Sequence, residues 1–248
     1  NVKTIGDRTF LGCAGLTSVI LPEGLERINY QAFYSCSALQ SIHLPDSITV
    51  MQDYVFDGCT KLASVNYPAS WVTKEDSYRY RSPFAGCTGL KTMNVPEGVT
   101  KIPDKAFCGA SLESISLPGT LTEIGDSAFE DCTKLKAIDI PESVTTIGVS
   151  SFEGCTGLKT VKVPDSVVDL GGYAFKDCTG LTSVYISSNV KTIGDRTFLG
   201  CTGLTSVVLP EGLERINYWA FYSCSALQSI HLPDSITVMQ EGVFAGCT

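Results

Sequence analysis

One phenylalanine recurs at a nearly constant interval along the whole chain, and this period constrains the fold more than any other feature. Most of the eleven phenylalanines are 23 residues apart, and ten of them are followed three residues later by a cysteine. A period of roughly 20 to 50 residues indicates stacked copies of one supersecondary unit, because each copy can bury its apolar face only against its neighbours. We therefore expect a single solenoid domain over residues 1–248, although length alone would allow two globular domains. The phenylalanines are Phe10, Phe33, Phe56, Phe84, Phe107, Phe129, Phe152, Phe175, Phe198, Phe221 and Phe244.

Each unit contains one clear strand pattern. Residues 158–164 read L-K-T-V-K-V-P, and the equivalent residues 135–141 read L-K-A-I-D-I-P. The alternation of apolar, mostly β-branched residues with polar ones predicts a short, half-buried strand. Because proline has no backbone N–H to donate to a neighbouring strand, it is expected to end this one.

The other half of the unit has a different pattern. Residues 124–132 read I-G-D-S-A-F-E-D-C, with apolar residues spaced closer to the helical period. Glycine suits a turn that needs a positive φ, so this segment predicts a bend followed by one helical or 3₁₀ turn. One parallel strand per unit with a compact return path makes a right-handed coil, whose strands stack about 4.8 Å apart. Leucine, isoleucine or valine, phenylalanine and cysteine would then each form a column in the core.

The motif L-x-x-V-x-L-P combined with I-G-x-x-A-F-x-x-C resembles the BspA-like, or Treponema-type, family of leucine-rich repeats over essentially the whole chain. The resemblance implies a leucine-rich-repeat coil with a parallel β-sheet on one face and short, 3₁₀ or helical turns on the other. It also implies a protein on, or secreted from, bacterial cells or those of some protozoan parasites, where several members act in adhesion. Proline stands near the place of the asparagine of other leucine-rich repeats, which favours this subfamily.

Two irregularities interrupt the period, and one long block is copied. The step from Phe56 to Phe84 is 28 residues, which predicts an insertion around 66–83. The next irregular unit is one residue short and carries Cys108 out of register. Residues 189–248 repeat residues 1–60 with six differences. Since the pattern is cut open at both ends, we expect the chain to be a fragment of a longer array. The differing pairs are Ala14/Thr202, Ile20/Val208, Gln31/Trp219, Asp53/Glu241, Tyr54/Gly242 and Asp57/Ala245.

Charge and hydropathy exclude some classes of partner. The net charge is −8, which disfavours general affinity for nucleic acid or for anionic membranes. No apolar run approaches the length of a membrane span, so this segment is not expected to insert into a membrane. A cell-surface or secreted location is expected, with any signal and anchor outside this segment.

Eleven cysteines allow three interpretations. A disulfide framework is common in secreted proteins, but stacked repeats hold their Cβ vectors parallel, whereas disulfides need converging ones. A spacing of 23 residues is also unlike that of zinc ligands. The pattern favours a column of buried, reduced thiols that fill the core as small apolar groups, with isolated disulfides and metal binding as weaker alternatives. Cys108 is the one thiol that we expect to be exposed, because it is out of register.

The sequence offers little support for catalysis. His43 and His231 are the only histidines, and they are copies of one position in the duplicated block. No nucleophile, zinc-protease or phosphate-loop motif accompanies them, and strand alternation points both outward. We therefore expect a protein that is not an enzyme and that needs no cofactor or metal.

The outward positions of the strand carry the functional prediction. One column is almost entirely Ser or Thr, and the column beside it varies from unit to unit, which suits a broad, concave docking surface. The alternative is that these residues serve only solubility and strand formation. The partner-binding candidates in the varied column are His43, Asn66, Asn94, Asp139, Lys162, Tyr185 and His231.

Two clusters of aromatic residues add further candidates. Tryptophan, tyrosine and arginine are enriched in binding hot spots, although such rings also cover local apolar surface. The first cluster lies in the insertion and comprises Trp71, Tyr78, Arg79, Tyr80 and Arg81. The second comprises Tyr218, Trp219 and Tyr222.

These observations predict a non-catalytic binding module, part of a surface adhesin. Its expected partner is a protein or glycan of the host extracellular matrix or cell surface, and the array is also compatible with self-association. The alternative is a structural spacer that presents another domain. The aromatic insertion favours binding, whereas length and regularity fit both.

Overall fold

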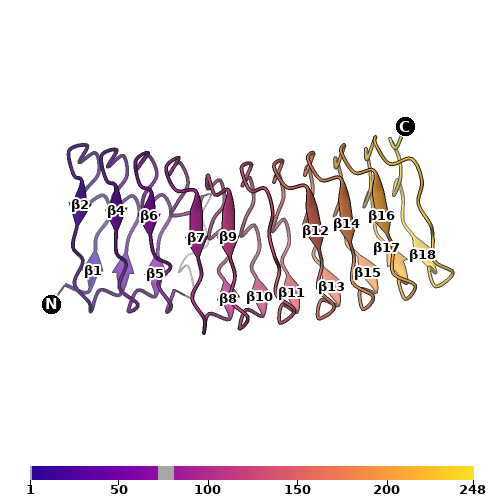
Figure 1. The fold of residues 1–248 in the computed structure, drawn as a ribbon, viewed down its shortest axis with the longest axis horizontal. Helices are drawn as coiled ribbons and strands as arrows, with labels where there is room; N and C mark the ends of the chain where they lie inside the picture. Colours follow the sequence, from indigo (N-terminus) through magenta and orange to yellow (C-terminus); the bar gives the residue numbers. More distant parts are fainter. Residues whose placement is uncertain (1, 72–80) are drawn as a thin grey trace.

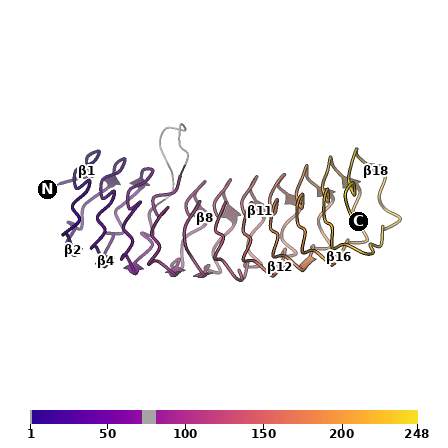
Figure 2. The ribbon, with the colours of Figure 1, turned by 90° about the horizontal axis from the view of Figure 1, so that it is seen from above.

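The chain forms an elongated stack of rungs, each made by one repeat, with the two termini at opposite ends (Figure 1). This computed structural model describes residues 2–71 and 81–248. Most rungs contribute strands to two rows, which run along different sides of the stack (Figure 2). We call these rows the front face and the rear face. All strand pairs are parallel, as the solenoid prediction requires.

The front face carries the strands that the alternating pattern predicts in most rungs, whereas residues 137–139 and 229–231, where the pattern also predicts a strand, form none. The apolar residue of each strand, such as Val161, points inward, and its polar neighbours Thr160 and Lys162 point outward. The front strands pair in three sheets with the orders β2-β4-β6, β7-β9 and β12-β14-β16. They are β2 (Ser18–Val19), β4 (Ser41–Ile42), β6 (Ser64–Val65), β7 (Thr92–Asn94), β9 (Ser114–Ser116), β12 (Thr160–Lys162), β14 (Ser183–Tyr185) and β16 (Ser206–Val208).

The rear face carries a second strand per rung, which the sequence did not predict. These strands are only two residues long, too short for alternation to be recognised, and each places one apolar residue inward, such as Ile147. They pair in the orders β1-β3-β5 and β18-β17-β15-β13-β11-β10-β8. They are β1 (Thr4–Ile5), β3 (Arg27–Ile28), β5 (Val50–Met51), β8 (Lys101–Ile102), β10 (Glu123–Ile124), β11 (Thr146–Ile147), β13 (Asp169–Leu170), β15 (Thr192–Ile193), β17 (Arg215–Ile216) and β18 (Val238–Met239).

The segment before and after each phenylalanine is a tight turn. The described residues contain no helix, so the predicted helical or 3₁₀ turn is not formed there. The backbone reverses instead through left-handed residues two positions after every phenylalanine, such as Gly154 (φ 71°), and two positions before each one except Phe84, such as Ser127 (φ 52°). A left-handed non-glycine residue costs roughly 1–2 kcal/mol. This cost is offset by bonds between rungs, such as the one from Ser127 N to Val149 O at 2.8 Å.

The glycine of the I-G pair has a different role from the predicted one. It is not the residue with positive φ; it lets adjacent rungs approach closely. A Cβ on Gly125 would lie 2.8 Å from the backbone nitrogen of Asp104 and 2.8 Å from the oxygen of Ile102. Real Cβ atoms essentially never lie this close to backbone, so a side chain at position 125 would require the adjacent rung to move. Rungs that carry Asn29, Gln52 or Pro103 at the equivalent place show that the requirement is local to the rungs with glycine.

The eleven phenylalanine rings form a continuous stack through the core. Neighbouring ring centroids are 4.9 to 5.9 Å apart and neighbouring planes lie within 16° of parallel. The nine rings from Phe33 to Phe221 are fully buried, whereas those of the first and last rungs are partly exposed. The inside assignment of the phenylalanine column is thus confirmed.

A ladder of thiols runs beside the phenylalanine stack. Cys155 Sγ donates to the backbone oxygen of Phe129 in the preceding rung at 3.1 Å, and the same bond recurs along the column. The cysteines are free thiols. Burial raises the pKa of Cys59 to about 12 and that of Cys178 to about 12. The donors are Cys36, Cys59, Cys87, Cys132, Cys155, Cys178, Cys201, Cys224 and Cys247.

The expectation that Cys108 is exposed is wrong. Cys108 is buried, with its sulfur 4.0 Å from Glu130 Oε2 of the next rung. Ala110 takes the column position three residues after Phe107, and the missing residue falls between it and the buried Leu112. The exposed thiol is Cys13, which lies in the first rung.

Replacement of Phe152 by alanine tests the stack. Because this ring contacts rings above and below, Phe152→Ala should lower the free energy of unfolding by about 3 to 5 kcal/mol. The measurement is urea denaturation followed by circular dichroism. Val149→Ala, at an exposed position of the same rung, should change stability by less than about 0.5 kcal/mol. A loss below about 1 kcal/mol for Phe152→Ala would contradict the stack's role.

Thiol accessibility tests the ladder. Burial keeps these thiols shielded and raises their pKa, so at pH 8 they are protonated and unreactive. An aromatic disulfide reagent should label Cys13 at once and Cys247 more slowly, and should label all eleven cysteines only in denaturant. Disulfide-linked peptides from the native protein, or prompt labelling of Cys155, would show that the ladder is not formed.

Candidate binding surfaces

The outward residues of the front face form two columns that the strands hold in register. Lys162 of β12 is aligned with Tyr185 of β14, which is aligned with Val208 of β16. Because every second strand residue points outward, these side chains lie in line across the rungs. We call this line the variable column. It comprises Ile20, His43, Asn66, Asn94, Ser116, Asp139, Lys162, Tyr185, Val208 and His231.

Exposure of the variable column agrees with its predicted orientation. Ile20 is 98% exposed, Val208 64% and Tyr185 47%. Large apolar side chains at such exposures are not needed for solubility or for the core. They are therefore available for contact with another molecule.

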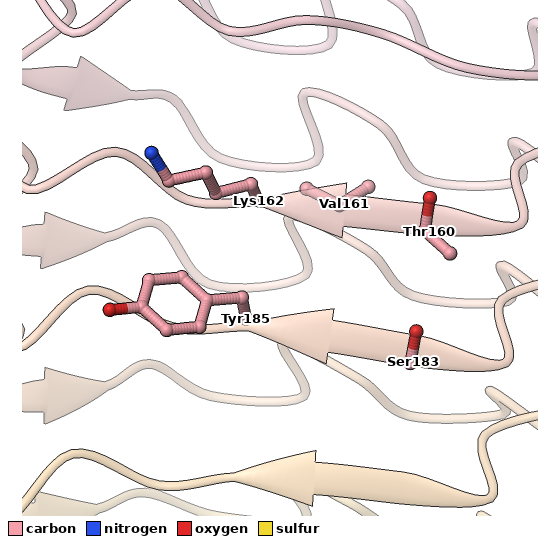
Figure 3. Close-up of a pocket in the computed structure, with 5 residues that line it drawn as sticks. All are labelled: Thr160, Val161, Lys162, Ser183 and Tyr185. Atoms are coloured by element: carbon pink, nitrogen blue, oxygen red, sulfur yellow. The ribbon is translucent and has the colours of Figure 1, made fainter.

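A shallow hollow lies between strands β12 and β14 on this face. Its volume is about 350 Å³, and Figure 3 shows Lys162 and Tyr185 extending side by side beyond the ends of the two strands. Lys162 Nζ lies 2.5 Å from Glu142 Oε1, and this hydrogen bond raises the lysine pKa. The hollow thus has an ammonium group and an aromatic ring at one end. Its lining residues are Thr160, Val161, Lys162, Ser183 and Tyr185.

Other candidates of the variable column have different surroundings. Asp139 lines a second shallow hollow of about 370 Å³ with Ser116. His231 Nε2 lies 3.8 Å from Glu211 Oε1, and both side chains are exposed. His43 and Asn94 are exposed.

Asn66 is held by the neighbouring rung. Its Oδ1 accepts from the backbone nitrogen of Leu44 and its Nδ2 donates to the backbone oxygen of Leu44, both at 2.8 Å. The amide extends the pairing of β4 with β6 beyond the strands. Its first role is therefore to hold two rungs together.

Trp71 does not belong to an exposed aromatic cluster, and that prediction is wrong. Its side chain is fully buried. The ring centroid lies 5.2 Å from that of Tyr67, 6.1 Å from Phe84 and 6.3 Å from Phe107. The irregular unit has a longer step before Phe84 than the other units have before their phenylalanines. Trp71 packs there beside the phenylalanine stack and enlarges the core. Sequence alone could not distinguish this from exposure, because aromatic residues suit both.

The remaining candidates of the insertion are only partly described. Tyr78, Arg79 and Tyr80 lie outside the described residues. Arg81 is exposed and lies near Asp57, where it acts against the burial that raises the pKa of this carboxyl group.

The second aromatic cluster is on the surface of the turns. Tyr218 is 43% and Tyr222 40% exposed, and Trp219 between them is partly exposed. The structure adds a residue that sequence reasoning missed. The guanidinium carbon of Arg196 lies 4.2 Å from the Trp219 ring centroid and 5.3 Å from that of Tyr173. The three residues are spaced by 23, so the repeat period itself contained this signal.

The described residues contain neither a cluster of metal-ligating side chains nor a helix that could cross a membrane. Within residues 2–71 and 81–248, no three His, Cys, Asp or Glu side chains gather as metal ligands would. No helix in this part of the chain has the length and apolar character to cross a membrane.

Comparison with known proteins identifies the repeat. The family model described as BspA type leucine rich repeat region matches residues 1–82, 80–182 and 169–248, which together cover the chain. None of the curated protein sequences matches significantly.

Several solved structures have a similar fold. A leucine-rich-repeat protein from Eubacterium ventriosum has 21% identity and a TM-score of 0.57, over 93% of this chain and 82% of that one. The pneumococcal vaccine antigen PcpA has 22% identity and a TM-score of 0.55, over 98% of this chain and 57% of that one. A leucine rich cell surface protein from Faecalibacterium prausnitzii has 27% identity and a TM-score of 0.48, over 99% and 81%.

Replacement of Trp71 tests its place in the core. Trp71→Ala should lower the free energy of unfolding by about 3 to 5 kcal/mol, because the ring fills space against three aromatic neighbours. Chemical denaturation measures this, with the exposed Lys61→Ala as a control that changes stability by less than about 0.5 kcal/mol. If Trp71→Ala were as stable as the control variant, the burial of Trp71 in the core would be contradicted.

Proposed function

Because the chain belongs to the BspA-type leucine-rich-repeat family, we propose that it is a non-catalytic binding module of a surface or secreted adhesin. Its front face binds a protein or glycan outside the cell. The observation that carries this proposal is the variable column, which exposes different side chains at equivalent places of successive rungs. Such variation on a regular frame gives the front face different contacts from rung to rung, as a docking surface of a repeat array requires.

The frame suits recognition because it is rigid. Interior front strands pair on both sides, as β4 does with β2 and β6, and the phenylalanine stack lies beneath them. The backbone of such strands is already ordered before a partner binds, so no binding energy is spent on ordering it.

The chemistry of the column suits an extended, mixed surface. Ile20 and Val208 offer apolar contact, Tyr185 offers a ring with a polar tip, and Lys162 offers a cation. The hollows beside them are shallow, and shallow sites suit the surface of a macromolecule better than a buried small substrate.

The location is part of the same proposal. The family resemblance implies a protein on or outside the cell, and we extend this to the present chain. A host matrix protein or a cell-surface glycan is the partner that such a location makes available.

A second candidate function is that of a spacer. The elongated stack with termini at opposite ends favours it, because such a shape moves whatever follows the chain away from what precedes it (Figure 1). The two functions predict different results in a binding experiment.

The test is the binding of the protein to a basement-membrane extract and to an array of printed glycans. Wild type should bind at least one of them saturably. Lys162→Ala/Tyr185→Ala should weaken that binding by about tenfold or more, since aromatic anchors carry a large share of binding energy. Lys101→Ala is the matched control, because its Nζ is also paired with a glutamate, Glu123 at 2.6 Å, but on the rear face.

The outcomes separate the two functions. Loss of binding in the front-face variant, with an unchanged melting temperature and normal binding by Lys101→Ala, supports the proposal. Absence of saturable binding by wild type, or equal weakening in both variants, overturns it and favours the spacer.

A further inference from the structure

The turns that precede each phenylalanine carry a further column of surface side chains, made by the residues two positions before each phenylalanine. In successive rungs near the C-terminal end this column contains Tyr173, Arg196, Trp219 and Gly242, all with positive φ. We call the first three the arginine–aromatic ladder. The Arg196 guanidinium lies over the rings of Tyr173 and Trp219, and its Nη1 donates to the Tyr173 hydroxyl.

The duplicated block provides an internal comparison for this ladder. In the first block Arg8, Gln31 and Tyr54 stand where the second block has Arg196, Trp219 and Gly242, and Tyr173 lies before the second block. In the first block Arg8 Nε donates to Gln31 Oε1 at 2.9 Å, so the guanidinium is held by an amide and not by an indole ring.

Two of the six differences between the blocks compensate each other in size. A Cβ at Gly242 would lie 2.3 Å from Cδ1 and 2.5 Å from Nε1 of Trp219. The tyrosine that the first block has at this place, Tyr54, could not coexist with this position of the indole ring. Gain of Trp219 and loss of the tyrosine side chain therefore belong together, as one structural change confined to this surface.

This change accompanies a hollow in the second block. The hollow has a volume of about 280 Å³ and lies between the ladder and the column that follows each phenylalanine. The column of residues that directly follow each phenylalanine also has a smaller side chain in the next rung, where Ala245 stands in place of Asp57 of the first block. The lining residues are Arg196, Leu199, Trp219 and Tyr222.

The hollow combines apolar walls with hydrogen-bond donors. Leucine and the two rings supply the walls, while arginine and indole nitrogens can only donate. Among the described residues Arg196 forms no ion pair, and the adjacent Asp195 is not paired with it. A ligand that fits must present acceptor oxygens to a cation, and a ring-sized apolar face to the walls.

We propose that this hollow binds a carboxylate-bearing sugar unit of a glycan. The carboxylate pairs with the Arg196 guanidinium, whose planar fork matches it, and the C–H face of the sugar ring lies against Trp219 and Tyr222. The volume suits one ring. The site is on a different surface from the front face, so either proposal can fail without the other.

An acidic peptide fits less well, because the backbone here has no free edge. Arg196 N donates to Tyr218 O at 2.9 Å, Gly200 N to Tyr222 O at 2.8 Å and Trp219 N to Glu241 O at 3.1 Å. An extended peptide gains most of its affinity from such backbone groups. A sugar is recognised through its rim of oxygens and its C–H face, which side chains alone can contact.

Tryptophan fluorescence is the natural measurement. The chain has two tryptophans, and Trp71 is fully buried, so a ligand that changes the emission reports on Trp219. The probes are trigalacturonate and a hyaluronan tetrasaccharide, with the methyl ester of trigalacturonate as the neutral control and triglutamate as the peptide control.

Two variants complete the experiment. Trp219→Gln/Gly242→Tyr restores the pair that the first block contains, so this variant is expected to fold, and its binding is followed by calorimetry. Arg196→Gln removes the cation together with its contacts to Tyr173 and Trp219 but keeps the indole ring, so its binding is followed by fluorescence. Circular dichroism and the melting temperature check the fold of both.

The proposal predicts saturable binding of at least one acidic oligosaccharide to wild type. Esterification or Arg196→Gln should weaken it about tenfold or more, because a charge-assisted pair is lost. Trp219→Gln/Gly242→Tyr should abolish it. Absence of binding at concentrations on the order of 1 mM, equal affinity for the ester, or equal affinity in either variant overturns the site. Equal affinity for triglutamate overturns the assignment to a sugar.

Discussion

Eleven phenylalanine rings, one from each repeat, lie over one another from Phe10 to Phe244 with their planes nearly parallel. This contact sets the distance and rotation between rungs, and the other columns follow from it. Each thiol reaches the phenylalanine carbonyl of the preceding rung only at that spacing. The same spacing brings glycines such as Gly125 and Gly148 close to the backbone of the preceding rung. Since each rung contacts mainly its neighbours, the array is stabilised by repeated local contacts and not by one central core.

The irregular units show how this constraint is kept when the sequence departs from it. Phe84 remains in the stack despite the long step before it, and Trp71 with Tyr67 fills the wider space beside it. In the short unit, Ala110 occupies the thiol position and Cys108 is buried elsewhere. An insertion or a deletion is therefore absorbed in the segments between phenylalanines, because the stack itself tolerates no shift.

Outside the irregular units the core is repeated from rung to rung, so most chemical differences between rungs lie on the surface. The front face varies along one column of strand residues, and the turns vary along the column that contains Arg196 and Trp219. The two copies of the duplicated block illustrate this separation. They share every residue of the stack, and three of their six differences lie in the two turn columns that border the hollow beside Trp219.

The sequence by itself determined the period, the front strands and the inward columns, because these depend on the spacing and polarity of residues within one unit. It also determined which strand residues point outward, such as Lys162 and Tyr185. Only the tertiary structure decided the rear strands, the left-handed turn residues, the burial of Trp71 and Cys108, and the position of Arg196 between two rings. Each of these features depends on which residues of the adjacent rung lie next to it. The pattern within a single repeat does not contain that information.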